Sequence, residues 1–255
     1  MNKIFSVAKY TFLEILRSRV MFAVLLMGLV VFVISYVASE FAYGAPMKVS
    51  LDFGIGLLSM SNLGLGLFFG ASLLAKEIES KTLYMVLSRP VKRYQFLIGK
   101  ALGLSAIVLI NTALMGIITF IIFKIYGGAW SSLMMMTLLF SFFEAMIVMV
   151  IAIIFSLITS IQLSVILTMF IYFSSHALEE TSKLSFVKSN EIIMVIIKTA
   201  KFFLPYLEIL NLKDYLIYQQ SLSVQHYSMS TLYFIVYFSA LVIVANAIFN
   251  KKNLD

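Results

Sequence analysis

The sequence contains no cysteine, which excludes a disulfide framework and a thiolate metal site. Proline interrupts it only at Pro46, Pro90 and Pro205. Charged residues make up 12% of the chain, against about 25% in a typical soluble domain. Because so few polar groups cannot cover a chain that is 62% hydrophobic, the solvent for most of it must be lipid.

Long apolar runs recur through all 255 residues, which we interpret as one transmembrane domain covering 1–255. A helix needs about 20 apolar residues to cross the bilayer core, where no exposed backbone amide finds a partner. The sequence therefore predicts an all-α, polytopic membrane protein with six spans. We place them at Val20–Ala38, Phe53–Ala75, Ile98–Phe123, Ser132–Ile158, Leu163–Leu178 and Met229–Phe249.

The first 19 residues form an amphipathic segment ahead of the first span. Its apolar residues recur at helical spacing, while its charged residues lie mainly on other faces. We expect a helix lying flat in the headgroup layer, retained in the mature protein because the following apolar run is longer than that of a cleaved signal peptide. The apolar residues are Ile4, Phe5, Ala8, Phe12, Ile15 and Leu16.

The distribution of basic residues predicts the orientation, since Lys and Arg in short loops favour the cytoplasmic side. Of the 19 basic residues, 12 fall on one side of the six spans, together with both termini. Two, Lys48 and Lys124, lie in the short loops opposite, and the other five are balanced by acidic residues in the segment 179–228. Both termini should then be cytoplasmic. The net charge of +7 is typical of such orientation signals and does not indicate nucleic-acid binding.

The outer segment 179–228 contains a stretch around Ile192–Ile197 that could be mistaken for a seventh span. Such a span would carry Lys198 and Lys201 at depth, at about 2.5 to 3.5 kcal/mol each. We predict instead an amphipathic helix on or dipping into the outer leaflet, which Pro205 ends before a second short helix.

The one charge-dense stretch between spans is the cytoplasmic segment 76–97. Thr82 can cap a short helix, and Arg89 before Pro90 should leave the helical region. Pro90, with Ser88 upstream, can start the helix of the third span. The short helix would carry apolar side chains on one face, which suits docking into a groove on a soluble partner, although an unpartnered positive-inside loop fits equally well. These side chains are Leu83, Val86 and Leu87.

This segment resembles the loop between the second and third spans of permease subunits in the type-two ABC exporter family. The pattern is matched in order by Glu77, Glu79, Thr82, Leu87, Ser88, Pro90, Val91, Arg93, Gly99 and Lys100, with Lys81 where a glycine is usual. The run from Leu204 through Pro205 and Glu208 to Asn211 is similar to the segment that these permeases carry before their last span.

The resemblance implies an exporter permease in the cytoplasmic membrane of a prokaryote, pairing as a homodimer or heterodimer with two separate ATPase subunits that bind ATP and Mg²⁺. The coupling helix would contact the ATPase through Glu77, Glu79, Thr82, Leu83, Val86, Leu87, Arg89, Pro90 and Arg93. The chain itself lacks a nucleotide site and would not be an enzyme, because Gly99-Lys100 has neither the upstream glycine nor the following Ser or Thr of a phosphate-binding loop. An alternative is a membrane subunit that transmits ATPase motion to a periplasmic partner without moving a substrate.

Two polar residues lie inside predicted spans. Glu144, central in the fourth span, costs several kcal/mol if ionised and unpaired, so it should face a polar path, a dimer seam or a neighbouring helix rather than lipid. Asn111, central in the third span, is expected to form an interhelical hydrogen bond, with Glu144 as a plausible partner. Neither a catalytic constellation nor a metal site is expected, since the Met residues and His176 and His226 lack convergent ligands.

Glycines on the second and third predicted spans form small-residue faces. Gly66 and Gly70 stand at GxxxG spacing, as do Gly99 and Gly103. This spacing predicts close helix packing, with a seam between two copies of the chain as a further use that remains open.

Overall fold

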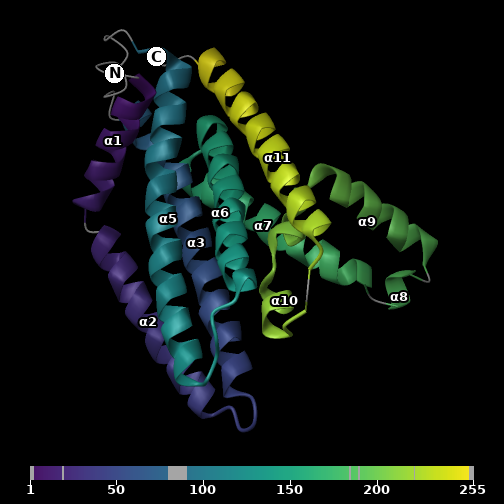
Figure 1. The fold of residues 1–255 in the computed structure, drawn as a ribbon. Helices are drawn as coiled ribbons and strands as arrows, with labels where there is room; N and C mark the ends of the chain where they lie inside the picture. Colours follow the sequence, from purple (N-terminus) through teal and green to yellow (C-terminus); the bar gives the residue numbers. More distant parts are fainter. Residues whose placement is uncertain are drawn as a thin grey trace.

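The computed structural model describes residues 3–18, 20–79, 91–183, 185–188, 190–220 and 222–252. All regular elements within these ranges are helical, which confirms the all-α prediction (Figure 1). In chain order they are α1 (Lys3–Leu16), α2 (Val20–Glu40), α3 (Pro46–Glu79), α5 (Arg93–Ile125), α6 (Ser132–Ile158), α7 (Ile161–Lys183), α8 (Ser185–Lys188), α9 (Glu191–Phe203), the 3-10 helix η1 (Leu207–Leu210), α10 (Lys213–Ile217) and α11 (Val224–Lys251).

Six of the helices in the described ranges, α2, α3, α5, α6, α7 and α11, are long and apolar enough to cross a membrane, as predicted. Five of them are longer than the predicted spans, and α3 and α5 are the longest of the six. With 34 and 33 residues, α3 and α5 are each about 50 Å long at 1.5 Å per residue, whereas the hydrocarbon core is about 30 Å thick. The end of α3 and the start of α5 lie at the end of the molecule where the two termini also lie (Figure 1).

The helix α5 begins at Arg93, not at Pro90 as the sequence suggested. Lys92 occupies the N-cap position in an extended conformation, and its backbone N–H donates to the side chain of Gln95 at 3.2 Å. A partner for this N–H three residues into the helix satisfies a donor that the helix leaves open. The first turn therefore starts three residues later than the proline.

The amphipathic helix α1 precedes the first span as expected, but it does not lie across the end of the bundle. It runs alongside the first turns of α5, because a Cβ added at Gly99 would meet Val7 at 2.7 Å and one at Gly103 would meet Thr11 at the same distance. Contact points that advance by four residues on both helices mean that the two run parallel. The missing side chains of the two glycines open the trough that α1 fills. A position within the headgroup layer stays a prediction.

Helix α6 lies at the centre of the bundle and packs closely against α3. A Cβ added at Gly70 would stand 2.5 Å from the backbone oxygen of Met149, and one at Gly66 would stand 3.1 Å from that of Ala145. The two backbones can approach this closely only because both positions are glycine. The predicted close packing is thus confirmed, and this glycine face is used within one chain.

The outer segment folds back onto the bundle after Pro205, which follows the end of α9 as predicted. Leu207, Leu210 and Leu212 are all buried to 1% exposure or less. They pack in one cluster with Phe140, Ile147, Val148 and Ile151 of α6. By contrast, the 13-residue α9 is too short to span the core, and it projects away from the bundle beside α7 (Figure 1).

Candidate functional site

Polar side chains meet inside the bundle in two groups. In the first group, Asn111 of α5 donates from its amide to Asn62 Oδ1 at 2.9 Å and to Ser61 Oγ at 3.0 Å, both on α3. Asn62 also exchanges hydrogen bonds with Thr112. Asn62 and Asn111 are 1% and 0% exposed. Their amides therefore lock α3 to α5 where no water competes.

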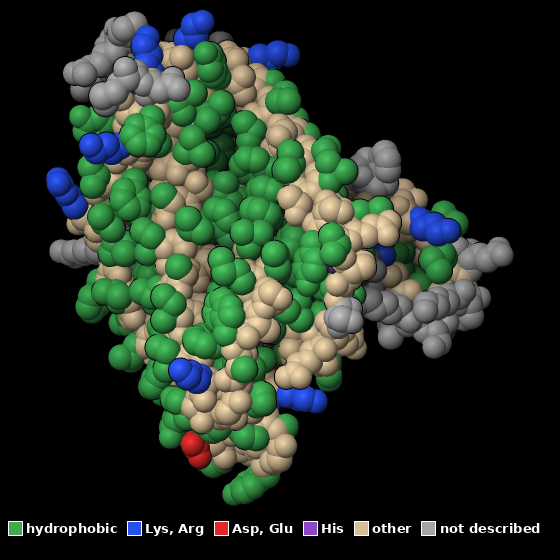
Figure 2. Space-filling model, in the orientation of Figure 1, with side chains coloured by type: hydrophobic (Ala, Val, Ile, Leu, Met, Phe, Trp, Pro, Cys, Tyr) green, Lys and Arg blue, Asp and Glu red, His purple; other side chains and the backbone are tan. Residues whose placement is uncertain are grey.

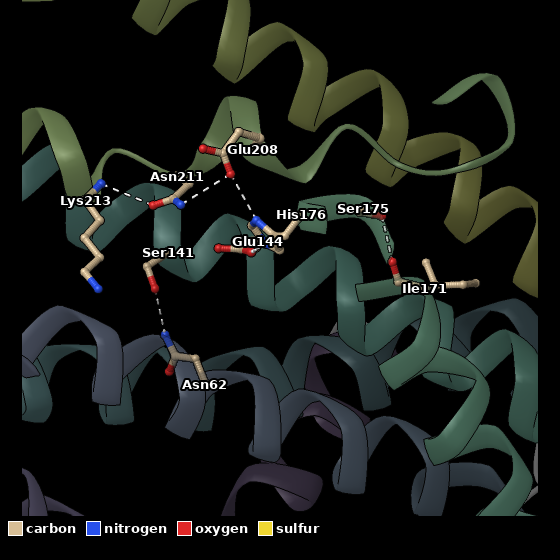
Figure 3. A network of polar contacts seen from close by, with 9 residues as sticks. All are labelled: Asn62, Ser141, Glu144, Ile171, Ser175, His176, Glu208, Asn211 and Lys213. Atoms are coloured by element: carbon tan, nitrogen blue, oxygen red, sulfur yellow. Dashed lines mark hydrogen bonds and ion pairs between the residues drawn. The ribbon is translucent and has the colours of Figure 1, made fainter. Parts of the chain in front are cut away.

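The second group joins three elements through an imidazole ring (Figure 3). His176 of α7 has its Nε2 at 2.8 Å from Glu144 Oε1 of α6 and its Nδ1 at 3.0 Å from Glu208 Oε2 of η1. Asn211, which follows η1, donates to the same Glu208 oxygen at 3.4 Å. The pairing satisfies the buried carboxylate of Glu144 and pins the outer segment to the middle of α6.

The geometry constrains the charge of this triad. Each of the two contacts between the ring and a carboxylate needs one proton to be a hydrogen bond. The two protons can both sit on His176, giving an imidazolium between two carboxylates, or one can sit on a carboxyl group beside a neutral ring. Two negative charges and one positive charge, or one carboxylate beside two neutral groups, both leave a single negative charge. The triad is thus a polar tie whose net charge is the same in either arrangement.

A narrow space separates the two groups. Ser141 accepts a hydrogen bond from Asn62 of the first group at 3.4 Å and stands one turn from Glu144 of the second group (Figure 3). The two groups therefore lie next to each other along α6. The cavity between them, which Tyr172 also lines, measures about 10 Å³. This is about the smallest volume that can hold one water molecule. In this conformation the network is a packed joint and not an open path.

These positions correct one expectation and add residues that the sequence reasoning missed. Asn111 bonds to Ser61 and Asn62, so it is not the partner of Glu144; that partner is His176. The outer residues Glu208 and Asn211 do meet Glu144 through the ring, while Pro205 lies buried next to them in sequence. Among residues of the described ranges, no three His, Asp or Glu side chains are placed to hold a metal ion.

The end of the molecule that carries both termini is cross-linked by basic side chains. Lys100 of α5 forms ion pairs with Glu77 of α3 and, at 3.9 Å, with Glu14 of α1. Lys252 donates from its ammonium to the carbonyl of Leu157, near the end of α6, at 2.7 Å. Helices α1, α3, α5 and α6 are therefore each tied to a neighbour at this end.

Arg93, the first residue of α5, clamps the end of α11. Its Nη1 donates to the backbone carbonyls of Phe249, Asn250 and Lys252 at 2.9, 3.1 and 3.0 Å. Its guanidinium also lies 5.8 Å from the centre of the Phe249 ring. A cation that caps the carbonyls of a helix C-terminus is favoured by the hydrogen bonds and by the helix dipole.

Most of the predicted coupling residues lie outside the described residues. This applies to Thr82, Leu83, Val86, Leu87, Arg89 and Pro90. The flanking residues are placed: Glu79 ends α3, and Glu77 and Arg93 make the contacts given above. The two long helices thus end and begin at the tied end.

In the part of the chain that the structure describes, six long apolar helices around a packed polar joint define a multi-pass membrane protein whose helices are tied together at one end. A family model described as ABC-2 family transporter protein matches residues 52–254. The chain belongs to this family and is a membrane permease component of an ABC transporter. A search of curated proteins finds no match.

The triad supports a prediction about stability. Replacing Glu144 with Ala should destabilise the permease by on the order of 3 kcal/mol. The Nε2 atom of His176 would lose its hydrogen-bond partner and would face an apolar gap. Gln should recover most of this loss, since its amide still reaches the ring. Thermal unfolding in detergent measures both variants. Equal losses for Ala and Gln would show that the hydrogen bond to His176 carries no weight.

Proposed function

We propose that this permease is the membrane subunit of an ATP-driven exporter, a single transmembrane domain over 1–255 that works as a pair of permease chains with two separate ATPase subunits. The ATPase would dock on the segment 76–97 and would bind the ATP and Mg²⁺. Family membership supports the pairing with an ATPase. The observation that carries the coupling role is the set of ties around this segment.

Motion of the docking segment would reach the bundle through these ties. The segment leaves α3 at Glu79 and enters α5 at Arg93. A push on it would move α11 through the three carbonyl bonds of Arg93, and α1 through Lys100. Since rigid helices transmit such displacements along their length, ATPase closure can change the packing of several spans together.

The helices would carry this motion from the docking segment to the central polar joint. Helices α3 and α5 meet there through Asn62 and Asn111, and α6 carries Glu144 to the His176 tie. An interior held by hydrogen bonds has discrete arrangements, so the joint would switch between packings as the helices shift. The present packing, with a cavity of about 10 Å³, would be a closed one.

Co-purification tests the proposed function. The tagged permease, expressed together with a candidate ABC ATPase subunit from the same organism, should bring down the ATPase in equal amount, and the complex should hydrolyse ATP. A Glu-to-Gln change of the catalytic base in that ATPase is the control, because it should abolish hydrolysis while leaving the pair intact. A permease that purifies alone from cells rich in the ATPase would contradict the proposal.

The proposed orientation places both termini and the docking segment in the cytoplasm of a prokaryotic cell. Lys and Arg gather toward the end that carries the termini, while the sides are largely hydrophobic (Figure 2). Reporter fusions after Asn250 or within 76–97 should therefore report the cytoplasm, and one near Lys188 the outside. An outside signal after Asn250 would be incompatible with six spans in this orientation.

A further inference from the structure

An apolar groove opens on the side of the bundle between α2 and α3. It measures about 620 Å³, within the range of ligand sites. Met60, Gly64 and Phe68 stand one turn apart on α3 and form its near edge, with Met60 and Phe68 62% and 65% exposed. A Cβ added at Gly64 would meet nothing within 4 Å, so this glycine is a notch in the wall. The opposite side is made by Ala23, Val24 and Met27 of α2.

A charged pocket adjoins the groove toward the end that carries the termini. Phe69 and Ser72 of α3 line both spaces. The second pocket, about 220 Å³, is also lined by Glu14, Glu77 and Lys100. The two spaces together have the shape of an amphiphile, with a long apolar part and a small charged part at one end.

The charges in the pocket indicate which headgroup fits. Among the described residues that line the pocket, two carboxylates and one ammonium give a net negative charge, so an anionic headgroup gains nothing overall from these three side chains. Lys100 is 12% exposed and pairs tightly with Glu77, whereas its distance to Glu14 is 3.9 Å, the outer limit of an ion pair. The Glu14 side chain is 73% exposed and can turn to a new cation. A headgroup with a phosphate for Lys100 and an amine for Glu14 complements both.

We propose that the groove binds one glycerophospholipid with a primary amine in its headgroup, the chemistry of phosphatidylethanolamine, from the leaflet on the side of the termini. One acyl chain lies against Met60, Gly64 and Phe68, and the headgroup reaches Glu14 and Lys100. A charge-matched pocket at one end distinguishes this groove from ordinary lipid-facing surface. The proposal concerns binding by the permease alone and does not depend on an ATPase.

The test measures which lipids the intact permease retains. The protein is reconstituted in vesicles of equimolar phosphatidylethanolamine and phosphatidylglycerol, extracted in mild detergent and washed, and the bound lipids are quantified by mass spectrometry. The wild type should be enriched in phosphatidylethanolamine. Gly64→Trp should lose this enrichment, because the indole would fill the notch, where an added Cβ meets nothing within 4 Å. Leu109→Trp is the matched control, because Leu109 lies on the outer face of α5 and is 52% exposed. This variant should keep the enrichment in phosphatidylethanolamine.

A second variant tests the headgroup end without touching the groove. Glu14→Lys should shift the retained lipid toward phosphatidylglycerol, since the pocket then has two cations and one anion, and it changes only an exposed side chain. Equal retention of both lipids by the wild type would overturn the proposal, as would unchanged enrichment in Gly64→Trp. So would a Gly64→Trp variant that separates paired permease chains while keeping the bound lipid, because the groove would then hold a second copy.

Discussion

Replacing Leu83 and Leu87 together with Asp should leave the permease in the membrane without its ATPase. The sequence puts both side chains on one face of the proposed coupling helix, where they would fill a groove on the partner. Apolar anchors in a desolvated groove typically contribute about 2 kcal/mol each. Losing about 4 kcal/mol weakens binding about a thousandfold, which is enough to empty the complex during purification.

The measurement is the amount of ATPase that co-purifies with each tagged permease from detergent. Lys92→Ala is the matched control, because Lys92 is an exposed residue within the same segment and charges at a rim contribute little. In the proposed topology both variants change residues outside the bilayer, so chain abundance in the membrane should equal that of the wild type. If the double variant retains the ATPase in full and hydrolysis is unchanged, the segment 76–97 is not the coupling element.

The spans could be predicted because hydrocarbon imposes a simple rule on the chain. Each needs about 20 apolar residues with internally satisfied amides, and this requirement is visible in the sequence alone. The break at Pro205 was equally local, since proline cannot continue a helix. Neither rule predicts how far the segment after Pro205 reaches into the bundle. Leu207 and Leu210 follow the break, yet they pack against the middle of α6.

The polar joint could be predicted only in part. Glu144 and Asn111 were recognised because buried polar groups in a membrane need partners. The same rule applied to Asn62, inside the second span, would have found the true partner of Asn111. His176 carried a weaker signal, because it lies near the end of its span and meets Glu144 only after α7 and η1 have been placed.

The helix α1 shows how local and long-range signals can disagree. Its amphipathic pattern predicted a helix lying flat on the membrane, and the same pattern serves equally for packing against a neighbour. The Gly99 and Gly103 pair pointed to close packing, but the sequence alone did not say which helix would enter the trough. Only the contacts with Val7 and Thr11 identify α1 as that helix.

The second large effect is expected on the stability of the fold. It compares a glycine-to-leucine change at Gly70 with the same change at Gly64, six residues away on α3, which serves as the control. Gly70→Leu should prevent α3 and α6 from packing, because its Cβ would stand 2.5 Å from the carbonyl oxygen of Met149 and 2.8 Å from the Cβ of Ala152. Backbone cannot move aside as a flexible side chain can, so α3 must separate from α6. Overpacking of this kind costs about 3 kcal/mol or more, which a marginally stable protein cannot absorb.

Gly64→Leu adds the same side chain to the same helix but should leave the fold intact, because the new Cβ meets nothing within 4 Å. The readout is the yield of monodisperse permease from membranes, followed by its thermal unfolding in detergent. Gly70→Leu should yield little folded protein, or protein that unfolds at a clearly lower temperature, while Gly64→Leu should match the wild type. Equal behaviour of the two variants would mean that the close approach of α3 to α6 does not hold the bundle together. A loss confined to Gly64→Leu would place the essential contact on the groove side of α3, against the packing described here.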